Sequence, residues 1–195
     1  MIEQLSKLYS SQVADLHIQG ISTGFISSLG HDFVAALYKA VAEDENSFGF
    51  VASENGEVLG FVAFTTNLSK LYKYVALKKG LRFVFILARR MTSWKVLEKI
   101  WSNIFYPGKM KSLNLPDAEL LSIVIAPQGR GKGLAIQLVE RGFEECVKRG
   151  IDKVKVLVAA ENEPANKLYL KCGFKLAGHI DSHGVTSNIY VAQIK

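Results

Sequence analysis

One stretch of the sequence constrains the fold more than any other, because its pattern changes twice over a short distance. Residues 120–125 are largely apolar, residues 126–133 are rich in glycine, and residues 134–148 repeat apolar side chains at helical spacing. A buried strand that passes through a tight turn into an amphipathic helix is a building unit of α/β proteins. The chain is therefore predicted to fold around a sheet with helices laid against it.

Other segments carry the same two periodicities. Runs rich in β-branched and aromatic residues flank Asn55-Gly56, which favours a hairpin turn because both residues tolerate positive φ. Ser10 or Ser11 can cap a first helix, and Asp32 stands near the start of a second. The predicted strands are 2–5, 48–52, 58–64, 120–125, 153–159, 174–176 and 188–194, and the predicted helices run through 13–17, 33–41, 134–148 and 164–171. Strands with helices between them indicate a mixed α/β sheet.

Length and composition limit the class of protein. The 195 residues are 49% hydrophobic and 22% charged, which predicts a single globular domain over 1–195. The uninterrupted apolar run Phe83–Ala88 is far shorter than the ~20 residues of a membrane span, and the first residues do not resemble a secretory signal. A cytoplasmic location is expected.

Metal and disulfide chemistry is not indicated by the sequence. Cys146 and Cys172 lack CxxC spacing, so we expect two reduced thiols packed as small apolar groups. The histidines have neither metal nor triad spacing, and we expect surface or loop positions for all four: His17, His31, His179 and His183. No metal site is predicted.

The positive charge is concentrated in one segment. The whole chain carries a net charge of +6, whereas residues 67–112 alone carry +10 and the remainder carries −4. This segment is predicted to be a helical insert that serves substrate or partner recognition. Its two helical stripes are Leu77, Leu81, Val84, Phe85 and Ala88, and then Trp94, Leu97, Trp101, Ile104 and Phe105. Apolar residues also fill the other side of the first piece, which therefore lies between two layers or faces an apolar partner.

The glycine-rich turn is predicted to bind an anion. Glycines let the backbone approach a ligand, and the free N–H groups at a helix start attract negative charge, so a pyrophosphate is the expected ligand. Arg130 and Lys132 add two cations there. A Walker A loop does not fit, because Gly133 follows Lys132 where Ser or Thr is required. A dinucleotide fingerprint does not fit either, because Leu134 or Ile136 stands at its third glycine.

Two motifs together resemble those of the GCN5-related N-acetyltransferase (GNAT) superfamily. The first is Gln-x-x-Gly-x-Gly over 128–133, directly after a strand. The second is Asn-x-x-Ala-x-x-Leu-Tyr-x-x-x-Gly-Phe over 162–174, in the expected order and distance. The resemblance covers about 118–174 and implies a mixed, mostly antiparallel sheet flanked by helices, with the basic helical insert 67–112 before the cofactor-binding strand.

The resemblance implies a binding site for acetyl-coenzyme A as co-substrate. Two central strands would splay apart, the backbone of residues 123–125 would bond the pantetheine arm, and the amides of 129–133 would hold the pyrophosphate. Asn162 and Asn166 would contact the far side of the cofactor. The full expected set is Ile123, Val124, Ile125, Gln128, Gly129, Arg130, Gly131, Lys132, Gly133, Leu134, Asn162, Ala165 and Asn166.

The resemblance also implies roles in acyl transfer to an amine. An amine of pKa ~10.4 is only about one part in a thousand unprotonated at neutral pH, so a base is needed, and Glu119 stands where relatives often carry a glutamate. Tyr169 stands at the position of the acid that protonates the departing thiolate. The N–H of Val124 or Ile125 is the candidate donor to the oxyanion. Phe25 and Leu29 are expected to line the acceptor pocket.

Three functions remain open at this stage. The first is an N-acetyltransferase that acts on a small-molecule or peptidic primary amine by direct attack in a ternary complex. The second is an acyl-coenzyme A-binding protein with little catalysis, recruited through the basic insert to an anionic membrane or acidic carrier. The third is nucleic-acid binding through Tyr72, Tyr74, Trp94 and Trp101, which ranks lowest because both tryptophans lie on an apolar stripe. The acceptor cannot be read from the sequence, and a homodimer is a further option.

Overall fold

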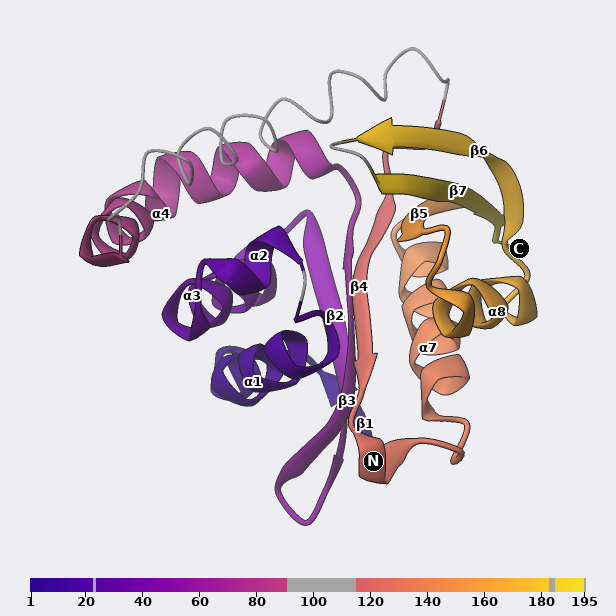
Figure 1. Cartoon of the computed structure of the whole chain (residues 1–195), viewed down its shortest axis with the longest axis horizontal. Helices are drawn as coiled ribbons and strands as arrows, with labels where there is room; N and C mark the ends of the chain where they lie inside the picture. The colour runs from indigo at the N-terminus through magenta and orange to yellow at the C-terminus, as the bar shows by residue number, and fades with distance from the viewer. Residues whose placement is uncertain (23, 91–114, 183–184, 195) are drawn as a thin grey trace.

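The computed structural model describes residues 1–22, 24–90, 115–182 and 185–194 (Figure 1). These residues form a seven-stranded sheet in the order β1-β2-β3-β4-β5-β7-β6. The β4–β5 pair is parallel and the other neighbouring pairs are antiparallel, which confirms the predicted mixed, mostly antiparallel sheet. The strands are β1 (Ile2–Gln4), β2 (Ser47–Glu54), β3 (Glu57–Thr65), β4 (Glu119–Ile125), β5 (Lys153–Ala159), β6 (Lys175–Ser182) and β7 (Val185–Gln193).

Helices cover both faces of the sheet. In Figure 1, α1 to α4 lie on one side of the central strands, and α7 and α8 lie on the other. The helices are η1 (Lys7–Tyr9), α1 (Ser10–Gly20), α2 (Phe25–Ser28), α3 (His31–Glu43), α4 (Leu68–Arg90), η3 (Pro127–Gly129), α7 (Leu134–Lys148) and α8 (Glu163–Lys171). None of the helices in these described ranges is both long and apolar enough to cross a membrane.

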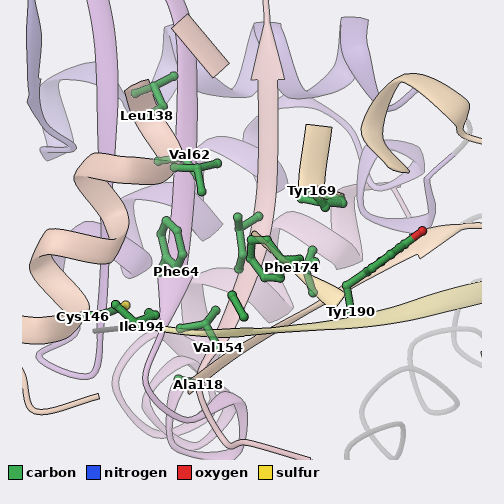
Figure 2. Close-up of a cluster of buried hydrophobic side chains, with 14 of the residues drawn as sticks. Val62, Phe64, Ala118, Leu138, Cys146, Val154, Tyr169, Phe174, Tyr190 and Ile194 are labelled. Carbon is green, nitrogen blue, oxygen red and sulfur yellow. The ribbon is translucent and has the colours of Figure 1, made fainter. Parts of the chain in front are cut away.

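The sheet separates two hydrophobic cores, and β3 contributes to both. Val62 and Phe64 enter the core under α7 and α8, whereas Phe61 and Ala63 enter the core under α1 and α3. Figure 2 shows Val62 and Phe64 in the first core together with Leu138 and Cys146 of α7. The alternation follows from the pleat, and burial on both faces explains why β3 reads as a continuous apolar run.

The local predictions agree with the structure except at element ends. Asn55 and Gly56 have φ of 51° and 81°, as the hairpin prediction requires. α1 begins at Ser10, and the capping side chain is that of Ser6, which serves the preceding 3-10 helix. The sixth strand is longer than the predicted 174–176, because a register shift between Leu176 and Gly178 interrupts its period but not its pairing with β7. The short helix α2 was not predicted.

The basic segment begins with α4, which confirms the first of its two predicted helical pieces. Leu71 and Phe83 are buried, and the Phe83 ring meets Phe33 of α3 edge to face with 4.9 Å between centroids. Leu77 and Leu81 point away from the core and are exposed. The first piece therefore packs on α3 by one side only. The predicted stripe from Trp94 to Phe105 lies outside the described residues.

Candidate active site

β4 and β5 separate shortly after they meet. They pair only at Glu119 with Lys155 and at Leu120 with Val156, although β4 continues along β3 as far as Ile125. The β3–β4 register shifts between Ala63 and Phe64, so Leu121 is an extra residue on β4. Such a bulge bends a strand and increases its twist. Beyond Leu120, the edge of β4 that faces β5 has no strand partner within the described ranges, and its backbone groups are open to a ligand.

The glycine-rich turn lies at the far end of this open edge. η3 leads into Gly131 and Gly133, whose φ angles of 75° and 73° are in the left-handed region, and α7 then begins at Leu134. No side chain caps α7, and its first turn holds no acidic residue. The N–H groups of residues 131–133 are therefore available to an anion, whereas those of Gly129 and Arg130 already donate to the carbonyls of Ala126 and Pro127 at 2.9 and 3.2 Å. Gly129 is needed for space, because a Cβ there would lie 3.0 Å from the Leu59 carbonyl oxygen.

A cavity of about 370 Å³ opens beside this turn. One wall is Ile125 with the turn and the start of α7, and the other wall is α8. The α8 residues Pro164, Lys167, Leu168 and Lys171 were not predicted as site residues, although their i, i+3, i+4, i+7 spacing places them on one helix face. The side chain of Lys167 pairs with Glu163 at 3.0 Å, but both are over 70% exposed, so the pair is weak.

The other residues of the predicted loop are held by neighbouring groups. The Gln128 amide donates to Glu57 Oε1 at 2.9 Å and so joins the turn to β3. The Lys132 ammonium lies 3.8 Å from Glu54 Oε2, and both side chains are more than half exposed. These contacts fix the turn against the β2–β3 hairpin, while Arg130 lines the cavity.

The two predicted asparagines, Asn162 and Asn166, form hydrogen bonds that stabilise the fold. Asn162 Oδ1 accepts from the Ala165 N–H at 3.3 Å and caps α8. Asn166 is 9% exposed, and its amide donates to the Ala159 and Asn162 carbonyls at 3.0 and 2.7 Å. Its Oδ1 accepts from Asn188 and Tyr190 of β7. These bonds hold α8 against β5 and β7, and direct contact of either asparagine with a cofactor stays a prediction.

Tyr169 lies on α8 in the core under α7 and α8 (Figure 2). Its side chain packs against Phe174 and Tyr190, with ring centroids 5.5 and 6.3 Å away, and the residue is 4% exposed. Burial raises the pKa of its phenol well above the usual range, so the hydroxyl stays protonated at neutral pH. No other described group hydrogen-bonds this hydroxyl. Its proton is therefore not committed to the fold.

Glu119 lies where β4 and β5 still pair. Its Oε2 is 3.6 Å from Lys155 Nζ, and both residues are buried. Burial raises the pKa of the Glu119 carboxyl, and the positive charge of Lys155 opposes this only in part. Lys155 also donates to the backbone carbonyls of Pro116 and Asp117. Tyr72 of α4 is close by, and burial together with the charge of Glu119 raises its pKa to about 12.

A second buried polar cluster lies on the other face of the sheet, where α1 and α3 pack against β4. His17 Nδ1 lies 2.6 Å from the Tyr38 hydroxyl, which lies 2.7 Å from Ser122 Oγ. His17 is 6% exposed and burial lowers its pKa to about 4, so the expectation of a surface or loop position was wrong for this residue. His17 Nε2 has no hydrogen-bond partner among the described residues. No sequence pattern indicates this cluster, because Ser122 of β4 lies far along the chain from α1 and α3.

The remaining predicted residues lie as follows. Phe25 of α2 is half-buried, whereas Leu29, just after α2, is 4% exposed. The lining of an acceptor pocket by Phe25 and Leu29 stays a prediction. His31 and His179 lie at the surface and His183 lies outside the described residues.

The two cysteines are free thiols, as expected. Burial raises the pKa of Cys146 to about 12 and that of Cys172 to about 11, so neither is a thiolate at neutral pH. Within the part of the chain that the structure describes, no three His, Cys, Asp or Glu side chains gather as a metal site would require.

A family model described as the acetyltransferase (GNAT) family matches residues 18–174. The chain belongs to the GNAT acetyltransferase family. The match includes the open edge of β4, the glycine-rich turn and α8, and it confirms the resemblance drawn from the two motifs.

Curated relatives of this GNAT chain match over short stretches. Mycothiol acetyltransferase from Corynebacterium aurimucosum is 39% identical over 59 residues, which is 30% of this chain and 19% of the relative. Spermidine N(1)-acetyltransferase from Vibrio cholerae is 39% identical over 59 residues, 30% of this chain and 34% of the relative. Streptothricin acetyltransferase from Escherichia coli is 36% identical over 61 residues, 31% of this chain and 35% of the relative. The matches thus span about a fifth to a third of these relatives.

Solved GNAT structures share the fold over the whole chain. The ribosomal-protein-S18-alanine N-acetyltransferase of Escherichia coli has a TM-score of 0.64 at 16% identity and covers 100% of this chain and 94% of its own. A putative acetyltransferase, yncA, from Salmonella typhimurium with its cofactor acetyl-CoA has a TM-score of 0.63 at 16% identity, with the same two coverages. At these identities the likeness shows the fold.

Proposed function

We propose that the protein transfers the acetyl group of acetyl-coenzyme A to the primary amine of a small molecule, by direct attack in a ternary complex. The observation that carries this proposal is the open edge of β4, which leads directly into an uncapped helix start and a cavity with cationic walls. A molecule that combines a chain of amides with a pyrophosphate is complementary to both features. Membership of the GNAT family supports the same assignment.

The residues of the site fit coenzyme A. The backbone of residues 123–125 would bond the pantetheine amides, and the N–H groups of 131–133 at the start of α7 would hold the pyrophosphate, since those of Gly129 and Arg130 donate within the turn. Arg130, Lys167 and Lys171 line the cavity and would supply positive charge to the phosphates. Bound acetyl-coenzyme A supplies a thioester as the acyl donor. No metal ion is needed for this chemistry.

Tyr169 is proposed as the acid. When the amine attacks the thioester carbonyl and the carbon–sulfur bond breaks, the sulfur leaves as a thiolate that needs a proton. The Tyr169 hydroxyl is protonated at neutral pH and uncommitted, so it can donate that proton, and the proton that the attacking nitrogen loses as the amide forms restores the phenol. The Val124 or Ile125 N–H would stabilise the oxyanion, because β4 has no partner strand there.

Glu119 is proposed as the base that takes a proton from the acceptor ammonium, directly or through water. Burial raises its pKa, which makes the carboxylate a better proton acceptor than an exposed one. Lys155 keeps a counter-charge beside it at the first of the two paired steps of β4 and β5.

A small-molecule acceptor is favoured over a peptidic one. The relatives named for mycothiol, spermidine and streptothricin are acetyltransferases of small molecules by their names. The same relatives disfavour the alternative of a coenzyme A-binding protein with little catalysis. A cytoplasmic location and a homodimer stay predictions.

Two measurements test the proposal. Calorimetry of the full chain with coenzyme A should show one saturable site, and a panel of amines that includes spermidine should release free thiol from acetyl-coenzyme A with at least one member. Failure of a folded protein to bind coenzyme A would overturn the assignment. Binding without thiol release from any amine above the rate of acetyl-coenzyme A hydrolysis would overturn the catalytic part alone.

A further inference from the structure

Helix α4 carries apolar side chains on two opposite sides. The inner side is buried on α3 through Leu71 and Phe83, which are 2% and 6% exposed. On the other side Leu77, Leu81 and Val84 are 82%, 91% and 63% exposed. Their i, i+4, i+7 spacing places them in one row about 10 Å long, which we call the outer face of α4. Single exposed leucines are ordinary, but a row of them on a fixed helix indicates a partner surface.

The outer face is continued by cations without counter-charges. Residues 68–90 contain seven Lys or Arg and no Asp or Glu. Lys73 and Lys70 are exposed and precede Leu77 by one and two turns on the same side of the helix. Among the described residues no acidic group lies within ion-pair distance of Lys70, Lys73 or Lys78. By contrast, Lys79 on the inner side pairs with Glu43 at 2.7 Å. The partner surface should therefore be both anionic and apolar.

A cavity beside the outer face has the same mixed character. It has a volume of about 350 Å³ and lies between α3 and α4. Lys39, Lys78 and Lys79 contribute ammonium groups or their stems to its lining, and Leu77 and Leu81 of the outer face contribute apolar walls. An amphiphile with a phosphate head group and hydrocarbon chains matches this arrangement.

We propose that the outer face of α4 docks the protein on an anionic lipid bilayer. A bilayer interface presents phosphate groups to the lysines and hydrocarbon to the leucines in one plane, as the row from Lys70 to Val84 requires. A nucleic acid would satisfy the lysines but not the leucines, which offer no ring on which bases can stack. The contacts of α4 with α3 hold the helix in place before it meets a membrane. Docking therefore does not carry the entropic cost of ordering α4. Figure 1 shows α4 along the border of the helical layer, across the sheet from α7.

Vesicle flotation of the full chain tests this proposal without regard to catalysis. The protein should float with vesicles of phosphatidylcholine mixed with phosphatidylglycerol, and should not float with phosphatidylcholine alone. Added salt should weaken binding, because the lysines act through screened charge. Lys70→Gln and Lys73→Gln should each lower the partition coefficient about fivefold. Leu77→Ser with Leu81→Ser should lower it about tenfold or more.

Matched control variants lie on the opposite face of the sheet. Val147 of α7 is 48% exposed and Lys148 beside it is exposed, so Val147→Ser and Lys148→Gln remove the same kinds of group there. Both should leave vesicle binding unchanged. Circular dichroism and coenzyme A binding should be unchanged in all variants, because every substituted side chain is exposed and none belongs to the proposed active site.

Several results would overturn the proposal. These are no flotation, equal flotation with both lipid compositions, or equal loss of binding in the α4 and α7 variants. A dimer that Leu81→Ser dissociates, without vesicle binding, would assign the face to a second copy of the chain. Duplex DNA binding that the lysine variants abolish, without vesicle binding, would assign it to nucleic acid.

Discussion

Glu119 and Lys155 face each other across the first of the two paired steps of β4 and β5, with 3.6 Å between Oε2 and Nζ and both side chains buried. Lys155 is further fixed by the carbonyls of Pro116 and Asp117. The pair therefore stands one residue before the step, Leu120 with Val156, after which the two strands separate. This interaction joins the two strands and also offsets part of the rise in the pKa of Glu119 that burial causes.

Lys155→Met is expected to destabilise the protein by about 3–5 kcal/mol near neutral pH, because it leaves a buried carboxylate without its cation. The pKa of Glu119 is already raised by burial and would rise further without Lys155. As pH rises, the Glu119 carboxyl then ionises in the unfolded state before it ionises in the folded state. The loss of stability caused by the substitution is therefore larger at neutral pH than at acidic pH. Urea unfolding of the variant near pH 7 and near pH 5 measures this change.

The double variant Glu119→Gln with Lys155→Met is the control. It removes both charges, so it should be more stable than Lys155→Met alone. A double variant that is less stable than the single one would show that the two residues do not act as a pair.

His17 is expected to make stability depend on pH. Its pKa is lowered from 6.5 to about 4 by burial, so the folded state keeps it neutral while the unfolded state takes up a proton. The stability that this contributes is present above pH 6.5 and is lost as pH falls toward 4. The free energy of unfolding should therefore drop by about 2 kcal/mol between pH 7 and pH 5 from this residue alone.

His17→Gln isolates the contribution, because glutamine does not titrate and can still bond the Tyr38 hydroxyl. The difference in unfolding free energy between wild type and variant should change with pH by the stated amount. If that difference is the same at both pH values, His17 has the same pKa in the folded and the unfolded state.

The sequence predicted the elements that local patterns determine. The Asn55-Gly56 hairpin, the glycine-rich turn and helix 134–148 each depend on neighbouring residues, and all three are present as predicted. The His17–Tyr38–Ser122 chain could not be predicted in this way, because it joins three elements whose approach only the packed fold determines. The same holds for Lys155, which reads as an exposed strand lysine until β4 is placed beside β5.

Gly131→Ala is expected to weaken coenzyme A binding by about tenfold or more, because a side chain at this positive φ strains the turn and turns its N–H away from the phosphate. A Cβ at Gly131 would meet no atom within 4 Å, so the effect comes from the backbone and not from a clash. Calorimetry with coenzyme A measures the affinity.

Gly150→Ala is a matched control for this substitution. Gly150 follows α7 with a φ of 72°, close to the 75° of Gly131, and also has nothing within 4 Å of an added Cβ. Both variants should lose about 1–2 kcal/mol of stability, but only Gly131→Ala should lose affinity. Equal affinities would mean that the amides of this turn do not hold the pyrophosphate.

Tyr169→Phe is expected to lower turnover by roughly ten- to a thousandfold while the affinity for acetyl-coenzyme A stays nearly unchanged. The substitution removes only a hydroxyl that makes no hydrogen bond to the described residues, so the ring contacts with Phe174 and Tyr190 should remain. Steady-state thiol release and calorimetry on the same preparation separate turnover from affinity.

Tyr9→Phe is the control, because the hydroxyl of Tyr9 bonds Glu3 far from the open edge of β4. Unchanged turnover in Tyr169→Phe would exclude this phenol as the acid, and an equal loss in Tyr9→Phe would show that the loss reflects stability and not proton transfer.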